Sequence, residues 1–321
     1  MKIIILFLYF LICFSKLIDK VRKDVVNKAL LKLPKRETLD ILKMCLQMSS
    51  FKSSYSLNDV ESAYLVYKWI GQNIEHDKDD KNQGNNSTAA VTVYKTGKGG
   101  HIGITGLFKI MCGHLKIKAD RILGLTKGTS FSGMITKIIP KEYSWNYILI
   151  DKEYYLIDIV NSIYSEKKKK ERTSDFYFGM DPEASIRLHF PYDNKWQLLP
   201  NIVTIDKFKS MAYLEEGFYS IGLKTISPDI QSLGDNKRIF VKLTSDKSFD
   251  EIFDQLKFKF IESSLDKNHS PMIGDFNVNK RFNGEYTFFF GLYSDHFSCI
   301  DAQNKITGEY FGLMCFDSIK K

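Results

Sequence analysis

The sequence predicts an α+β protein: helices first, then an antiparallel sheet, then a second part built of strands. Helical periodicity dominates the first part of the 321 residues, from residue 16 onward. Strand-like runs at 121–125, 143–150 and 154–159 follow a glycine-rich turn. After residue 220, short apolar runs alternate with turn residues. Helices gathered ahead of an antiparallel sheet are typical of α+β folds rather than of doubly wound ones.

Residues 16–50 are predicted to be a helical lead-in with two apolar stripes, one on each side of Pro34. Asn58, with Glu61 three residues later, predicts a capped start for the next helix. A polar loop then runs from 77 to 87. The lead-in stripes are Leu17, Val21, Val25 and Leu30, then Leu39, Leu42, Cys45 and Leu46, and the face of the capped helix is Ala63, Val66, Tyr67, Ile70 and Ile74, with Trp69 beside it.

Glycines at 97, 99 and 100 predict a tight turn that enters a buried helix over His101–His114. Asp151-Lys152-Glu153, between the runs 143–150 and 154–159, predicts a hairpin. The apolar residues that make the 101–114 helix a buried one are Leu107, Phe108, Ile110, Met111 and Leu115.

The last third is predicted to begin with a short helical joint over 205–214 and to continue as strands, including 239–243 and 286–290. Asn283-Gly284 is a hairpin turn signal. Regularly spaced short strands favour a β-sandwich. We therefore divide the chain into a signal peptide (1–15), a helical lead-in (16–54), a core (55–204) and a sandwich-like β-rich domain (205–321).

The amino terminus has the pattern of a secretory signal. Lys2 precedes the apolar run 3–14, and Cys13 and Ser15 are small enough to flank a cleavage site. This predicts a secreted protein or one of the secretory-pathway lumen. An uncleaved signal anchor is the alternative, but the run is shorter than the roughly 20 residues of a membrane span. After removal of the signal no membrane span is expected.

Four cysteines remain once Cys13 is removed with the signal: Cys45, Cys112, Cys299 and Cys315. Four cysteines allow three full pairings, and the disulfide we favour joins Cys299 and Cys315, which share one strand-rich stretch. Their spacing fits no zinc motif, so no metal is expected. Asn85 and Asn86 begin overlapping glycosylation tripeptides, which fits a secretory glycoprotein.

The formal net charge of +8 raises the question of a nucleic-acid partner. The lysines are scattered, however, and the one dense run, 167–170, is flanked by Glu166, Glu171 and Arg172. Such a run is typical of a solvated loop. No nucleic-acid partner is therefore expected.

Three segments resemble the kyphoscoliosis peptidase branch of the transglutaminase-like superfamily. In that branch the segments carry Cys-Glu-Gly-Tyr, His-Ala-Trp-Asn and Tyr-Leu-Ile-Asp. The likeness covers about residues 55–215, extends over 63–77 and 177–199, and implies a papain-like core. The matching segments here are Gly99-Gly100-His101-Ile102-Gly103-Ile104 with Leu107-Phe108-Lys109 and Cys112, Tyr143-Ser144-Trp145-Asn146, and Tyr155-Leu156-Ile157-Asp158.

The resemblance implies that His101 stands at the nucleophile position, Tyr143 at the general-base position and Asp158 at the position that orients the base. Gly100, Trp145 and Asn146 would then belong to the groove. Acyl transfer needs a nucleophile and a base that activates it. A tyrosine with a pKa near 10 is a poor base at neutral pH.

Cys112 cannot replace the missing thiol, because it lies eleven residues further along the same helix, or about 16 Å away. We therefore expect a catalytically inactive, protein-binding member of the superfamily that uses no cofactor. The alternative is an active cysteine-peptidase-like or protein-crosslinking enzyme with a non-standard nucleophile. A carbohydrate-binding or adhesion protein is a third interpretation and depends only on the predicted sandwich.

Overall fold

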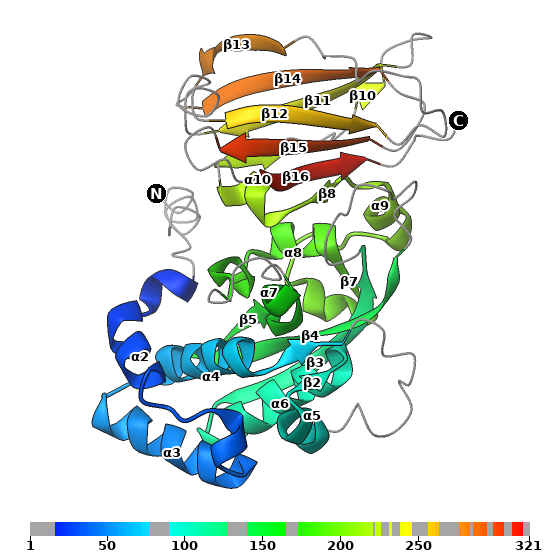
Figure 1. The fold of residues 1–321 in the computed structure, drawn as a ribbon. Helices are drawn as coiled ribbons and strands as arrows, with labels where there is room; N and C mark the ends of the chain where they lie inside the picture. The colour runs from blue at the N-terminus through cyan, green and yellow to red at the C-terminus, as the bar shows by residue number, and fades with distance from the viewer. Residues whose placement is uncertain are drawn as a thin grey trace, which may run out of the picture. The chain divides into compact units, whose positions relative to one another are not determined.

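The computed structural model describes residues 17–77, 90–127, 140–164, 173–220 and 222, and the backbone of the strands between 223 and 316 (Figure 1). The predicted signal peptide, Asn85, Asn86, the lysine run 167–170 and Asn283-Gly284 lie outside the described residues. The chain divides into two compact units, one of residues 1–125, 142–185 and 191–200, the other of 126–141, 186–190 and 201–321. The domain boundaries drawn from the sequence remain predictions.

The first unit is organised around helix α4 (Asp59–Asn73), which contacts α2, α6 and α7. Figure 1 shows α2 beside α4. The predicted cap is present: Asn58 Oδ1 accepts from the backbone N–H of Glu61, and a Glu61 carboxylate oxygen accepts from that of Asn58. The other elements are η2 (Leu17–Lys20), α2 (Lys23–Leu30), η3 (Arg36–Thr38), α3 (Ile41–Ser54), α5 (Ala90–Thr96), α6 (His101–His114), α7 (Ile159–Tyr164) and η4 (Asp175–Tyr177).

The predicted apolar face of α4 is buried, but the predicted stripe on α3 is partly wrong. Leu42 is 52% exposed and Leu46 is 61% exposed. The residues that α3 buries are Met44, Cys45 and Met48. Both sets have helical spacing, so periodicity alone cannot choose between them; the contact of α3 with α6 decides. On α6 itself, the predicted core residue Ile110 is 38% exposed.

The sheet of the core has the strand order β6-β5-β4-β3-β7. Strands β4 and β5 pair antiparallel, as do β5 and β6. A separate two-stranded parallel pair joins β1 to β2. The predicted strand 154–159 ends at Ile157, and α7 begins at Ile159. The strands are β1 (Glu75–His76), β2 (Lys98–Gly99), β3 (Lys118–Thr126), β4 (Lys141–Ile150), β5 (Glu153–Ile157), β6 (Phe178–Met180) and β7 (His189–Pro191).

The predicted hairpin is a two-residue turn between β4 and β5, with Ile150 opposite Glu153. Asp151 and Lys152 have φ of 52° and 69°, so both central residues are left-handed.

Because only glycine adopts this conformation without steric cost, Lys152→Gly is expected to raise the free energy of unfolding by about 0.5–1 kcal/mol. Urea unfolding measures this. Glu153→Gly, one residue further into β5, is the matched control and is expected to destabilise; a loss in Lys152→Gly would contradict the turn geometry.

The second unit carries two antiparallel sheets, with strand orders β10-β11-β14-β13, where β9 also pairs with β11, and β12-β15-β16-β8. The predicted strands 239–243 and 286–290 lie in β11 and β14, but the predicted joint 205–214 is a helix only to Ser210. The face-to-face sandwich remains a prediction. Its elements are α9 (Ile205–Ser210), β8 (Tyr213–Leu214), α10 (Glu216–Ser220), β9 (Leu223–Thr225), β10 (Gln231–Ser232), β11 (Arg238–Ser245), β12 (Leu256–Glu262), β13 (Phe276–Phe282), β14 (Glu285–Tyr293), β15 (Ser298–Asn304) and β16 (Tyr310–Phe316). The helix η5 (Asn194–Gln197) belongs to the first unit, and α8 (Pro182–Leu188) contains residues of both units.

Candidate functional site

The entrance to α6 is fixed by the short parallel pair of β1 and β2. The N–H of Glu75 donates to the carbonyl of Gly97 over 2.8 Å, and that of Asp77 to the carbonyl of Gly99 over 2.9 Å. Gly97 has φ of +73°, and a Cβ there would collide with the Arg36 side chain. Only glycine fits this turn. The turn therefore delivers His101 as the first residue of α6, with Gly100 as its N-cap.

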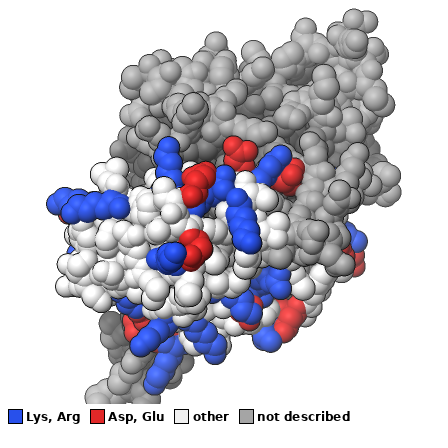
Figure 2. All heavy atoms as spheres, turned by 60° about the horizontal axis from the view of Figure 1, so that its bottom comes forward, with Lys and Arg blue, Asp and Glu red and all other residues white. Residues whose placement is uncertain are grey.

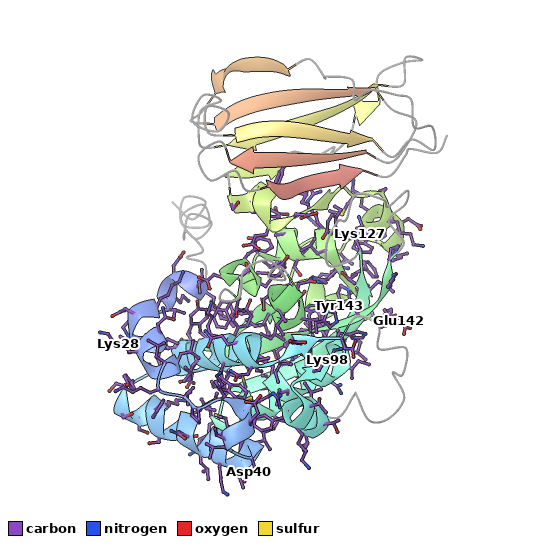
Figure 3. All side chains as sticks on the ribbon, viewed as in Figure 1. Lys28, Asp40, Lys98, Lys127, Glu142 and Tyr143 are labelled. Atoms are coloured by element: carbon purple, nitrogen blue, oxygen red, sulfur yellow. The ribbon has the colours of Figure 1, made fainter. Side chains whose placement is uncertain are left out.

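Side chains of α6 and β4 meet at this helix start; Figure 3 labels Tyr143 on β4 and Lys98 in the turn. His101 Nδ1 lies 3.1 Å from Ser144 Oγ, and Ser144 Oγ lies 3.1 Å from Thr105 Oγ1. Thr105 Oγ1 also donates to the carbonyl of His101 over 2.7 Å. The rings of His101 and Tyr143 are 5.3 Å apart between centroids. The predicted nucleophile and base positions are thus neighbours.

Asp158 connects the end of β5 to the start of α7. Its side chain is fully buried and accepts from the Tyr143 hydroxyl over 2.9 Å. It also caps α7, since it accepts from Asn161 N over 2.9 Å and from Asn161 Nδ2 over 2.6 Å. The three residues that the resemblance singles out are therefore in contact one after another. The His101 ring on α6 lies beside the Tyr143 ring on β4, and Tyr143 is hydrogen-bonded to Asp158 between β5 and α7.

The two other predicted groove side chains lie inside the scaffold. Trp145 is 1% exposed and Asn146 is fully buried. Asn146 Nδ2 donates to the carbonyl of Thr105 over 3.0 Å and to that of Asp120 over 3.2 Å. Asn146 thereby joins β4 to α6 and β3. Gly100, the third residue predicted to belong to a groove, is partly exposed.

Sequence reasoning missed three contributors to this site: Thr105, Ser144 and Asn161. Each carried a weak signal. Ser144 follows Tyr143 in the strand, Thr105 is one helical turn after His101, and Asn161 stands three residues after Asp158, where a capped N–H is expected. Hydroxyl and amide residues at such positions are too common to be assigned without coordinates.

The two cysteines of the first unit do not supply a nucleophile. Cys45 and Cys112 are buried and free. Burial raises the pKa of the Cys45 thiol to about 11. It raises the pKa of Cys112 still further, with a smaller contribution from Cys45. Both thiols therefore stay protonated at neutral pH and unreactive.

On the face drawn in Figure 2, lysines and arginines lie among aspartates and glutamates. Lysines pair with neighbouring acids, as in Lys43–Asp40, Lys52–Asp59, Lys98–Asp77 and Lys109–Asp120.

Among residues placed by the structure, no three histidine, cysteine, aspartate or glutamate side chains form a metal-binding group. None of the helices in the described part of the chain has the length and apolar character that crossing a membrane requires.

Residues 50–159 match the profile of the transglutaminase-like superfamily. The kyphoscoliosis peptidase of Mus musculus is 26% identical over 185 residues, covering 54% of this chain and 27% of that protein. Its Homo sapiens counterpart is 27% identical over 184 residues, covering 53% and 27%. Hillarin of Drosophila melanogaster is 23% identical over 184 residues, covering 51% and 22%. The chain thus spans about a quarter of the length of these relatives.

Solved structures with some likeness include one titled a TGase, at TM-score 0.30 and 10% identity, covering 45% of this chain and 37% of that one. A putative cysteine protease from Cytophaga hutchinsonii has TM-score 0.24 and 17% identity, covering 31% and 30%. Scores of this size do not by themselves establish a shared fold.

The profile match, together with the mixed helix and antiparallel sheet, defines an α+β core of the transglutaminase-like class. Within that class, the chain is similar to the kyphoscoliosis peptidases over about half of its length.

Proposed function

We propose that this chain is a catalytically inactive transglutaminase-like protein that acts as a protein-binding module of the secretory pathway or the cell exterior. The observation that carries the proposal is the contact set of His101, Tyr143 and Asp158, which stand where the family motifs have Cys, His and Asp. The three side chains are still neighbours, as they would have to be in a family enzyme. However, His101 replaces the cysteine and Tyr143 replaces the histidine of the motifs.

The chemistry of these groups favours inactivity. A family enzyme would place a thiolate at the helix start, where the helix dipole stabilises the anion. Here an imidazole occupies that place, so the thiolate that the helix dipole would stabilise is missing. The Tyr143 hydroxyl donates a hydrogen bond to Asp158, so its hydrogen is not directed at His101. A phenol, which is protonated at neutral pH, also takes up no proton from a nucleophile.

A binding role fits a scaffold that keeps its polar framework without the reactive thiol, because a fold can retain a recognition surface when its chemistry is lost. Two relatives are named kyphoscoliosis peptidase, and this chain matches about a quarter of their length. Peptide-like partners are the class that a papain-like groove would hold. The pairing of surface lysines with neighbouring acids favours protein over nucleic acid as the partner.

One observation favours a second candidate, an acyl-transfer enzyme with a serine nucleophile. Ser144 Oγ lies 3.1 Å from His101 Nδ1. In such an enzyme the hydroxyl proton would pass to the imidazole while Oγ attacks an acyl carbon, and the proton would return to the leaving amine. Two observations weigh against this candidate. Ser144 is fully buried, whereas the acyl carbon of a substrate must reach its Oγ. The same Oγ is also hydrogen-bonded to Thr105 Oγ1.

The test is turnover by the full chain, measured as peptide hydrolysis and as amine incorporation into a glutamine-containing peptide. We expect wild type, His101→Ala and Ser144→Ala to be indistinguishable from buffer. Turnover by wild type that disappears in either variant would overturn the inactive assignment, and loss in Ser144→Ala would select the serine enzyme.

A restoration experiment tests whether the groove survives. In the double variant His101→Cys with Tyr143→His, the new thiol stands at the first residue of α6, where the dipole lowers its pKa. We expect iodoacetamide to label this thiol at pH 6 at least about tenfold faster than the single variant His101→Cys, which lacks the base. Equal rates would show that the side chains at 101 and 143 are not placed for proton transfer.

A further inference from the structure

Two cysteines of the second unit occupy facing register positions. In the antiparallel pair of β15 and β16, Cys299 is the partner of Cys315. The neighbouring pairs, Ser298 with Phe316 and Ile300 with Met314, keep the same register. The register shift of this ladder comes only after Ile300. The cysteine pair therefore lies in a regular part of the ladder.

Facing positions of this kind suit a disulfide. Directly opposed residues in antiparallel strands have Cα atoms about 4.5–5.5 Å apart, depending on the type of pair. A disulfide needs Cα atoms about 4.4–6.8 Å apart. The Cα separation expected of an opposed pair thus lies within the range that a disulfide needs.

We propose that Cys299 and Cys315 form a cross-strand disulfide that joins β15 to β16. The two thiols lose two protons and two electrons as the S–S bond forms. A low-molecular-weight disulfide such as oxidised glutathione takes up both, in two exchange steps, and leaves as two thiols. The first thiolate attacks the external disulfide, and the second displaces glutathione from the mixed disulfide.

The bond would fix more than one hairpin. Strand β16 also pairs with β8, where Cys315 is the register partner of Tyr213 and Met314 that of Leu214. Both β8 residues are buried. A disulfide that fixes the register of β16 against β15 therefore also holds β16 in place for its pairing with β8. The function is structural, and it is independent of the proposed inactivity of the first unit.

Peptide mapping tests the bond directly. The full chain is equilibrated in a buffer of reduced and oxidised glutathione, unfolded in guanidinium with iodoacetamide, and digested with trypsin. Lys305 separates Cys299 from Cys315, so only a disulfide can hold their peptides together. We expect these two peptides linked and Cys45 and Cys112 alkylated. Alkylation of both Cys299 and Cys315, or mixed disulfides with glutathione at either, would overturn the proposal.

Thermal unfolding gives a second readout. Dithiothreitol is expected to lower the melting temperature of wild type by about 5 °C or more, because the reduced loop regains conformational freedom. Cys299→Ser is expected to melt at the temperature of reduced wild type and to show no response to dithiothreitol. Cys45→Ser, in the first unit, is the matched control and should keep the response. A wild type insensitive to dithiothreitol would contradict the bond.

Discussion

Asp158→Ala is expected to lower the free energy of unfolding by about 4 kcal/mol, because buried donors lose a charged acceptor. The Tyr143 hydroxyl and both nitrogens of Asn161 donate to this fully buried carboxylate. The variant also removes the cap of α7. Urea unfolding of the full chain, followed by tryptophan fluorescence, measures the loss.

Tyr143→Phe is the matched control, because it removes one of those donors and leaves the carboxylate with the other two. We expect a loss of about 1 kcal/mol. A carboxylate kept for catalysis commonly costs stability, so its removal would stabilise the fold. If Asp158→Ala unfolds no more easily than Tyr143→Phe, then Asp158 is not the structural centre of this site.

Glu61→Ala is expected to cost about 2 kcal/mol, because it removes the capping box of α4 together with its link to the lead-in. Glu61 is fully buried, and Arg22 donates to it from Nε over 2.5 Å and from Nη2 over 2.6 Å. Half of the Arg22 side chain is exposed, so solvent screens part of this pair. Lys43→Ala, which breaks only the exposed pair with Asp40, is the control and should change stability little.

The pH dependence follows from the same contacts. Burial acts to raise the pKa of Glu61, but the bonds from Arg22 and the N–H of Asn58 outweigh it and hold the pKa below its usual 4.5. A carboxyl whose pKa falls on folding adds stability above 4.5, and this stability is lost as pH drops through the folded-state pKa.

We therefore expect wild type to exceed Glu61→Gln in stability at pH 7 and the difference to shrink at pH 3. Urea unfolding at the two pH values measures it. A difference that grows on acidification would show that the pKa of Glu61 is raised in the folded state.

Local signals were sufficient for much of the fold. The cap at Asn58, the turn at Asp151-Lys152 and the glycine entry to α6 each depend on chemistry within a few residues, and the structure contains all three. The stripe of α3 could not be chosen, because Leu42 and Leu46 have the same helical spacing as Met44 and Met48.

The site was predictable only in part, for the same physical reason. Family motifs placed His101, Tyr143 and Asp158 in sequence, but the bond between His101 and Ser144 joins residues 43 positions apart. For Cys299 and Cys315, the shared strand-rich stretch was enough to favour a pair, but their facing positions come from the register of β15 and β16. Such contacts depend on how strands and helices pack, which local pattern does not encode.

Intact-protein mass spectrometry tests the inactivity of the site most directly. Wild type and the double variant His101→Cys with Tyr143→His are exposed to a peptide that carries a thiolate-reactive acyl group. We predict that the mass of wild type stays unchanged while the double variant gains one acyl group. An acyl adduct on wild type, mapped by digestion to His101 or Ser144, would contradict the account.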